Sequence, residues 1–209
     1  MTINDQDLQY ISNINRVNWQ KSSLNIPEKH QQELLWIEAS KNDPQGFAPL
    51  YDRYFKDIYL FVFKRIKDRE LTADLTSQVF LKALLHINKY ENRGAPFVSW
   101  LYRIALNEVN MYYRSGKKNI RLELNESHLV TLTEDTGLDE TDKNLQGMVD
   151  AMNRLPVEHA QLIELRFFEK KSFCEIGEIY NITEANAKVR VYRVLETLRK
   201  LMNLKKKGA

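Results

Sequence analysis

Apolar residues recur every three or four positions along most of this chain, which is the repeat of an α-helix with one buried face. Strict alternation of apolar and polar residues, typical of half-buried strands, is weak, and Gly and Pro are few. The pattern predicts an all-α protein. The repeat is clearest in a stripe that we expect to lie in a core: Phe47, Leu50, Tyr51, Tyr54, Phe55, Ile58, Phe61 and Val62.

The periodic segments fall into two small helical domains. We expect the first to span residues 31–116 and the second to span residues 145–204. Residues 1–30 are polar and rich in Asn, Gln and Ser, so we expect a loosely ordered extension with at most one short helix. Residues 117–144 have little periodicity, and they predict a flexible acidic linker between the two domains.

The net charge of +3 hides an uneven distribution. Residues 41–120 carry 14 Lys and Arg against 8 Asp and Glu, a net of +6, and residues 151–209 carry 12 against 7, a net of +5. Residues 121–150 carry 2 against 8, a net of −6. Two basic blocks separated by an acidic one are compatible with ordinary solvated surfaces and with binding to an anionic partner.

Several functional classes are disfavoured by what the sequence contains. Cys174 is the single cysteine, so neither an internal disulfide nor a thiolate metal site is expected. We find no apolar run near the roughly 20 residues that span a bilayer, no secretory signal, no nucleotide-binding glycine loop and no Ser/His/Asp spacing. We therefore expect a cytoplasmic protein that is not an enzyme, with no metal and no cofactor. The histidines are scattered, without metal-ligand spacing: His30, His86, His128 and His159.

The C-terminal basic block predicts a helix, a short turn and a second helix. Ser172 is expected to cap the first helix, and Asn181 tolerates the left-handed conformation at its end. Thr183 is expected to cap the second helix. The first helix should bury Phe173, Ile176 and Ile179.

The second helix of this pair has a buried and an exposed face. Helical spacing places Ala187, Val191, Val194, Leu195 and Leu198 on the buried side. The opposite face carries groups of the kind that read base edges in a DNA major groove, while flanking cations bind phosphate. A solvated basic helix, a helix docked in a partner's groove and a membrane-surface helix remain open as alternatives. The exposed and border residues are Ala185, Asn186, Lys188, Val189, Arg190, Tyr192, Arg193 and Glu196.

A second candidate site lies in the segment "YENRGAPFVSWLYRIALNEVNMYYRSGKK". Its aromatic rings and cations are interleaved, and single-stranded nucleic acid is bound by such a combination of stacking platforms and backbone-following cations. Part of the aromatic excess belongs to a core, and we assign Trp100, Ile104 and Val109 to packing.

Four segments in this order resemble the successive motifs of bacterial sigma factors of the sigma-70 family, and the compact extracytoplasmic-function type is the best match. The resemblance covers about residues 33–114 and 148–202. It implies that the first domain, sigma region 2, binds the clamp helices of core RNA polymerase and opens the −10 promoter element. The second, sigma region 4, would grip the polymerase flap and read the −35 element. The segments are "FAPLYDRYFKDIYLFVFKRI", "DLTSQVFLKAL", "FVSWLYRIALNEV" and "LPVEHAQLIELRFFEKKSFCEIGEIYNITEANAKVRVYRVLETLRK".

The resemblance also implies roles for individual residues. Polymerase binding is carried over to Asp74, Ser77 and Gln78, although many family members have Glu at the position of Gln78. Capture and melting of the −10 element are carried over to Arg93, Gly94, Ala95, Pro96, Phe97, Asn107, Tyr112, Arg114, Lys117 and Lys118. Contact with the −35 element is carried over to Arg166, Asn186, Lys188, Val189, Arg190, Tyr192 and Arg193.

The implied partners are core RNA polymerase, promoter DNA and an anti-sigma factor, with no small-molecule substrate and no membrane insertion. The main alternative is a stand-alone, two-domain transcription regulator with a helix-turn-helix output. Such a regulator accounts equally well for the C-terminal helix pair. It does not account for the aromatic loop "NRGAPFVSW" or for the acidic face around Asp74. Binding to core polymerase distinguishes the two functions.

Overall fold

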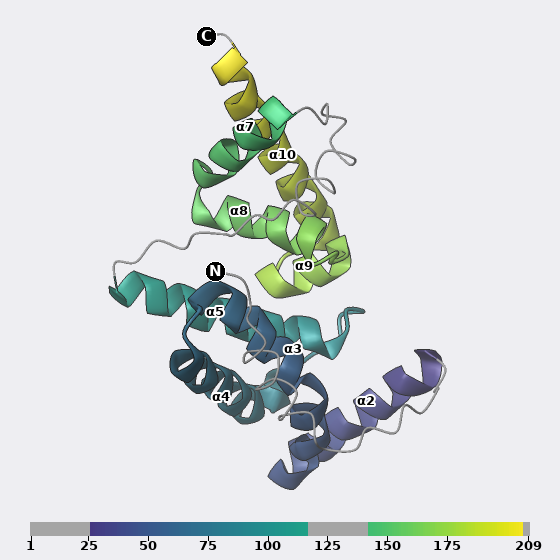
Figure 1. Ribbon diagram of the computed structural model, residues 1–209. Coiled ribbons are helices and arrows are strands. Elements are labelled where there is room, and N and C mark those ends of the chain that lie inside the picture. Colours follow the sequence, from purple (N-terminus) through teal and green to yellow (C-terminus); the bar gives the residue numbers. More distant parts are fainter. Residues whose placement is uncertain (1–25, 117–141, 207–209) are drawn as a thin grey trace.

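The computed structural model describes residues 26–116 and 142–206, and every regular element in these two ranges is helical, as predicted (Figure 1). We call them the N-terminal unit and the C-terminal unit. The N-terminal unit contains α2 (Ile26–Asn42), η1 (Pro44–Phe47), α3 (Ala48–Ile66), α4 (Arg69–His86), η2 (Ile87–Lys89) and α5 (Phe97–Gly116). The C-terminal unit contains α7 (Asp142–Asn153), α8 (Val157–Ile163), the π-helical turn η3 (Glu164–Phe168), α9 (Phe173–Tyr180) and α10 (Glu184–Lys206).

The unit boundaries differ slightly from those expected from the sequence. Helix α2 begins at Ile26, inside the segment expected to be a loosely ordered extension. Helix α7 begins at Asp142, inside the segment expected to be linker. The rest of that extension, residues 1–25, and the rest of that linker, residues 117–141, lie outside the described residues.

Short polar side chains determine where the helices of the N-terminal unit begin. The Asp43 carboxylate accepts the N–H of Gln45 at 2.9 Å and starts η1. The Asp68 carboxylate accepts the N–H of Leu71 at 2.9 Å and caps α4. Between α3 and α4, Lys67 takes the left-handed conformation with φ of 57°, which reverses the chain so that the two helices can pack side by side.

Helices α3, α4 and α5 pack against one another around the core of the N-terminal unit. Six members of the predicted stripe are buried there, but Tyr51 and Phe55 are not. Tyr51 is 38% exposed, and Phe55 is half-buried. Both rings lie close to Phe80 of α4, at centroid distances of 4.8 and 6.1 Å. They are not fully buried because the apolar stripe is wider than the surface that α4 covers.

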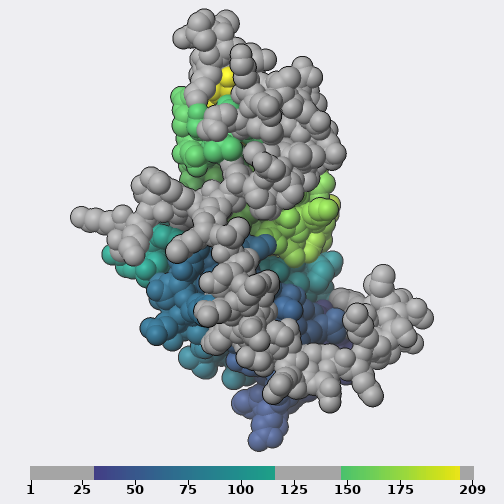
Figure 2. Space-filling view, in the orientation of Figure 1, coloured from purple at the N-terminus to yellow at the C-terminus, as the bar shows by residue number. Residues whose placement is uncertain are grey.

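The two units are in direct contact. Their buried apolar residues form one continuous cluster, and the main contact joins α5 to α9. Figure 2 shows the light green surface of the C-terminal unit lying directly against the blue and teal surface of the N-terminal unit. The units therefore share α5, which packs on its own unit along one side and on α9 along the other.

No helix among the described residues has the length and apolar composition to cross a membrane. Those residues also contain no group of three or more His, Cys, Asp and Glu side chains that could hold a metal ion.

Phe97, the first residue of α5, is central to the N-terminal core. Its side chain is fully buried, with ring centroids 5.0 Å from Tyr90, 5.4 Å from Trp100 and 6.0 Å from Tyr54. Phe97→Ala is expected to lower the free energy of unfolding by about 3–5 kcal/mol, because the lost ring leaves a cavity. Urea denaturation measures this, with Val98→Ala at a half-buried position as the control. A cost no larger than that of the control would contradict the central position of the ring.

Candidate nucleic-acid interface

The C-terminal helix pair is fixed by caps at the positions predicted from the sequence. The Ser172 hydroxyl accepts the Glu175 N–H at 3.1 Å, and the Glu175 carboxylate accepts the Ser172 N–H at 2.8 Å, which completes a capping box. Asn181 ends α9 in the left-handed conformation, with φ of 54°. The Thr183 hydroxyl accepts the N–H of Asn186 at 3.3 Å and starts α10. The helix-turn-helix prediction is confirmed in this geometry.

Gly177 allows the turn after α9 to fold closely onto the helix. A Cβ atom at this position would lie 2.9 Å from the carbonyl oxygen of Ile182 and 3.3 Å from the amide nitrogen of Glu184. A side chain here would push the start of α10 away from α9, so the angle between the two helices depends on glycine. The hydrophobic pattern of the sequence does not mark this position.

Helix α10 has the two faces that its periodicity predicts. All five residues assigned to the buried face are buried. The residues assigned to the opposite face are exposed, including Val189 at 46% and Tyr192 at 53%. Large exposed side chains beside the cations Lys188, Arg190 and Arg193 give this face both apolar and charged contact groups. The face can therefore contact base edges and phosphates together.

Phe173 is less buried than the sequence predicted, and Arg166 has a hydrogen-bond partner within its own unit. Phe173 is half-buried instead of buried, because its neighbours are themselves near the surface: the exposed Tyr192 ring, at 6.2 Å, and the half-buried Arg166 guanidinium, at 4.4 Å. The Arg166 guanidinium also donates to the carbonyl oxygen of Lys171 at 2.9 Å. Arg166 thus braces the loop that precedes α9, which leaves only part of its guanidinium for the predicted phosphate contact.

The loop before α5 is shaped by Asn92 and Gly94. Gly94 has φ of +85°, and its N–H donates to the Asn92 side chain at 3.0 Å. Arg93, Gly94 and Pro96 are exposed, whereas Ala95 is buried. Of the residues predicted to form the rim, the exposed Arg93, Gly94 and Pro96 can contact a base. The buried Ala95 and Phe97 cannot, and they support the loop by packing beneath it.

A buried carboxylate holds this loop to the rest of the unit. Glu33 on α2 accepts a hydrogen bond from the Tyr54 hydroxyl and one from the backbone N–H of Phe97 at 3.4 Å. The N–H is at the start of α5, where the helix dipole favours a negative charge. Burial, with smaller contributions from the charges of Glu33 and Glu178, raises the pKa of Tyr90, beside the loop, to about 12. The sequence analysis missed Glu33, because a single Glu in a polar segment gives no periodic signal.

The outer part of α5 carries the other predicted −10 residues. Asn107 and Arg114 are exposed, and Tyr112 is half-buried. Trp100 and Val109 are buried, which confirms their assignment to packing, and Ile104 is half-buried. Lys117 and Lys118 lie outside the described residues.

The polar face of α4 is exposed and contains an apolar extension that the sequence analysis missed. Asp74, Ser77 and Gln78 are all exposed. Leu81 and Leu85, one and two turns further along the same face, are 56% and 66% exposed. Exposed leucines beside polar groups are typical of a surface that binds another protein.

Lys82 follows on α4 but does not extend this polar face. Its ammonium group instead pairs with the Glu108 carboxylate of α5 at 2.6 Å, and Glu108 is only 4% exposed. The buried carboxylate needs a cation, so Lys82 turns toward α5 and ties the two helices together.

A cleft of about 680 Å³ lies between α5 and the C-terminal unit. Asn107 and Arg114 line it from α5, and Arg190 and Arg193 line it from α10. Residues predicted for the −10 element and residues predicted for the −35 element therefore face the same space. The sequence did not predict this, because it gave no information on how the two units pack.

Comparison with known proteins identifies the class. Residues 50–119 match the family model of sigma-70 region 2, and residues 151–200 match that of sigma-70 region 4. The chain belongs to the sigma-70 family of RNA polymerase sigma factors. Within that family it is of the extracytoplasmic-function (ECF) type, as the sequence motifs predicted.

Its relatives include sigma factors of this type from two bacteria. The ECF RNA polymerase sigma factor BldN of Streptomyces coelicolor is 28% identical over 166 residues, which cover 78% of this chain and 63% of BldN. The ECF RNA polymerase sigma factor SigM of Bacillus subtilis is 27% identical, over 74% of this chain and 93% of SigM. The structure of CnrH in complex with the cytosolic domain of CnrY shares the fold. It has a TM-score of 0.50 at 18% identity, covering 82% of this chain and 96% of that one.

Arg193 and Lys188 are expected to contribute differently to promoter selection. Arg193→Ala should relax the choice of base at one −35 position, because losing a bidentate contact with guanine costs about 1–3 kcal/mol of discrimination. Lys188→Ala should weaken all sequences alike and reduce the salt slope by about one, because a phosphate contact carries no sequence information. Sequencing of pools selected from randomised promoters with each variant and polymerase, at two salt concentrations, measures both effects. An unchanged −35 preference in Arg193→Ala would contradict this assignment.

Proposed function

We propose that this chain directs core RNA polymerase to promoters by three surfaces: the exposed face of α4, the loop before α5 and the exposed face of α10. The observation that carries the proposal is that exposed groups lie on each of these surfaces in a chain that matches sigma regions 2 and 4. In this function the chain needs no catalytic group of its own, because the polymerase performs the chemistry. Its site of action is the cytoplasm.

The α4 face suits the clamp helices of core polymerase. Asp74 supplies a carboxylate for a basic partner, and Ser77 and Gln78 supply hydrogen-bonding groups around it. Leu81 and Leu85 add apolar area that becomes buried only when a partner covers it. A helix face with a polar rim and exposed leucines is typical of a protein–protein interface.

The loop before α5 suits the capture of one unpaired base of the −10 element. Arg93, Gly94 and Pro96 form its exposed rim, and Asn107 and Arg114 follow on the same helix that the loop opens into. Flipping a base out of its stack costs a few kcal/mol, which contacts at such a rim must offset. The fully buried Phe97 beneath the rim keeps the loop in shape.

Helix α10 suits the major groove of the −35 element. Lys188, Val189, Tyr192 and Arg193 lie on its exposed face, and the exposed Val189 can contact a thymine methyl group. The C-terminal unit would also grip the polymerase flap. An anti-sigma factor is a further proposed partner, since it would regulate the chain by covering these surfaces.

A stand-alone helix-turn-helix regulator would leave the match to sigma region 2 unexplained.

Asp74→Arg tests the polymerase contact. The variant is expected to lower affinity for core polymerase at least tenfold, because it places a cation against a basic partner, while the helical circular-dichroism signal stays unchanged. The matched control is Asp52→Arg, which makes the same charge reversal at an exposed position on α3. Equal polymerase affinity of the two variants would contradict the clamp contact.

Replacement of residues 92–96 by a Gly/Ser loop tests promoter opening. The variant complex with polymerase should still bind promoter DNA in the closed form but should fail to open it, because the rim that holds the flipped base is gone. Permanganate footprinting detects opening as reactive thymines at the −10 element. Undiminished reactivity would show that melting does not depend on this loop.

A further inference from the structure

Both ends of the loop before α5 are held by α2. We call residues 91–96, between Tyr90 and Phe97, the capture loop. Where the loop ends, the Glu33 carboxylate of α2 accepts the backbone N–H of Phe97 at 3.4 Å. Where it begins, α2 packs on η2, the turn that leads directly into Tyr90. The rings of Tyr90 and Phe97 also meet edge to face, with centroids 5.0 Å apart, so the two ends of the loop are fixed to α2 and to each other.

The Glu33 carboxylate is a strong anchor because it is buried and has a second donor. Glu33 is only 5% exposed, and the Tyr54 hydroxyl of α3 donates to the same carboxylate. The N–H of Phe97 is among the first of α5, and such groups have no partner within their own helix. Breaking this bond would leave a buried carboxylate oxygen and a helix N–H unpaired, which is unfavourable. The charge of Glu33 also contributes, after burial, to the raised pKa of Tyr90, which shows that the carboxylate acts on both ends of the loop.

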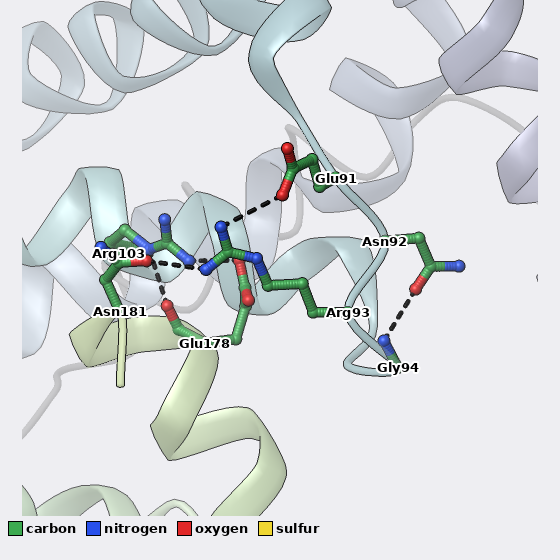
Figure 3. A network of polar contacts seen from close by, with 7 residues as sticks. All are labelled: Glu91, Asn92, Arg93, Gly94, Arg103, Glu178 and Asn181. Atoms are coloured by element: carbon green, nitrogen blue, oxygen red, sulfur yellow. Dashed lines mark hydrogen bonds and ion pairs between the residues drawn. The ribbon is translucent and has the colours of Figure 1, made fainter. Parts of the chain in front are cut away.

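Weaker bonds shape the loop above this anchor (Figure 3). The Asn92 side chain accepts the N–H of Gly94 at 3.0 Å, and Arg93 pairs with Glu91 at 3.2 Å. Arg93 also donates to the Asn181 side chain at 2.9 Å. All of these residues are exposed, and exposed polar pairs contribute little to stability. They give the rim its local shape, whereas its position relative to the helices depends on the buried anchor.

A rim that is already in position can hold a base more effectively than one that must be ordered first. Flipping a base out of the duplex is itself unfavourable. Ordering a mobile loop at the same moment would reduce the net gain from every contact that the rim makes. A binding site also has to keep its groups close to the geometry that the ligand needs, and buried supporting residues achieve this.

We propose that Glu33 is a positioning residue for promoter opening: its carboxylate holds the capture loop in its binding shape before the −10 base is flipped out. This rests on the proposed function, which assigns capture of that base to the loop. Glu33 is buried and acts through the N–H of Phe97, without touching DNA. Its loss should therefore impair opening, while polymerase binding and closed-complex formation continue.

Three substitutions of buried carboxylates test this. Glu33→Met keeps the length of the side chain but leaves the Tyr54 hydroxyl and the Phe97 N–H without their acceptor. Glu33→Gln is the conservative variant, because its oxygen can still accept the Phe97 N–H and its amide can donate to the Tyr54 oxygen. Glu108→Met is the matched control: Glu108 is 4% exposed in the same unit, but it pairs with Lys82 and not with the loop.

The measurement is permanganate reactivity of −10 thymines per closed complex, with each variant bound to core polymerase. Glu33→Met should lower opening at least tenfold, the loss of a hydrogen bond to a charged group. Glu33→Gln should lower it only about threefold, because it loses the charge at the start of α5 but keeps the bond. The control should open the promoter like the parent. Closed complexes should form equally in all four proteins.

A second promoter separates positioning from general damage. An abasic nucleotide is placed in turn at each −10 position of the non-template strand, and the position where the parent loses most opening marks the captured base. On that promoter the loop has no base to hold, so the parent and Glu33→Met should open it equally. A variant that is merely less stable would remain slower than the parent there as well.

Several outcomes overturn the proposal. Parent-like opening by Glu33→Met would do so, as would a defect equally large in Glu33→Gln or in the control, or one that persists on the abasic promoter. If circular dichroism shows that Glu33→Met does not fold, Tyr54→Phe takes its place, since it removes only the hydroxyl that orients the carboxylate. It should show a smaller loss that also disappears on the abasic promoter, and parent-like opening would again overturn the proposal.

Failure of the proposed function gives a different result. The Gly/Ser replacement of residues 92–96 would then open the promoter like the parent, because capture by this loop would not be needed. If that replacement blocks opening but Glu33→Met opens the promoter normally, the loop captures the base and only the positioning role of Glu33 is wrong.

Discussion

The packing of α5 on both of its sides is the constraint on which the rest of this structure depends. Its inner side supplies Leu101, Ala105 and Val109 to the core of the N-terminal unit, and all three are fully buried. Its outer side contacts α9 and carries Arg103 and Asn107. One helix thus contributes to the core of the N-terminal unit and forms the surface on which the C-terminal unit rests. A change in the position of α5 would affect both.

Buried charges that have partners help to fix how the helices pack, both within the N-terminal unit and between the two units. Arg65 with Glu164, Glu108 with Lys82 and Glu33 at the start of α5 each combine a buried ion with a polar or charged partner. An apolar contact tolerates sliding by a fraction of a turn, whereas a buried ion that loses its partner is costly. These pairs therefore select one register from the several that apolar packing alone would permit.

The hydrophobic pattern predicted most of the fold and less of the site. The helices, the three caps around the helix-turn-helix and both faces of α10 follow from local spacing and local hydrogen bonding, which a sequence records directly. Tyr51 and Phe173 were assigned to cores, because periodicity gives the direction of a side chain but not the width of the surface that covers it. Glu33, Gly177 and the Arg65–Glu164 pair were missed, because each depends on a residue brought close by the fold.

The π-helical turn η3 makes the arrangement of the units sensitive to chain length. Its N–H of Glu169 bonds to the carbonyl oxygen of Glu164 at 2.9 Å, one residue beyond the spacing of an α-helix. Deletion of one residue would restore α-helical spacing and rotate Glu164 relative to the helices that follow by about 100°. Relatives with and without that residue would keep the same apolar pattern and the same two units. They would differ in how those units meet, so a single-residue insertion or deletion gives evolution a way to change interdomain geometry while both cores stay intact.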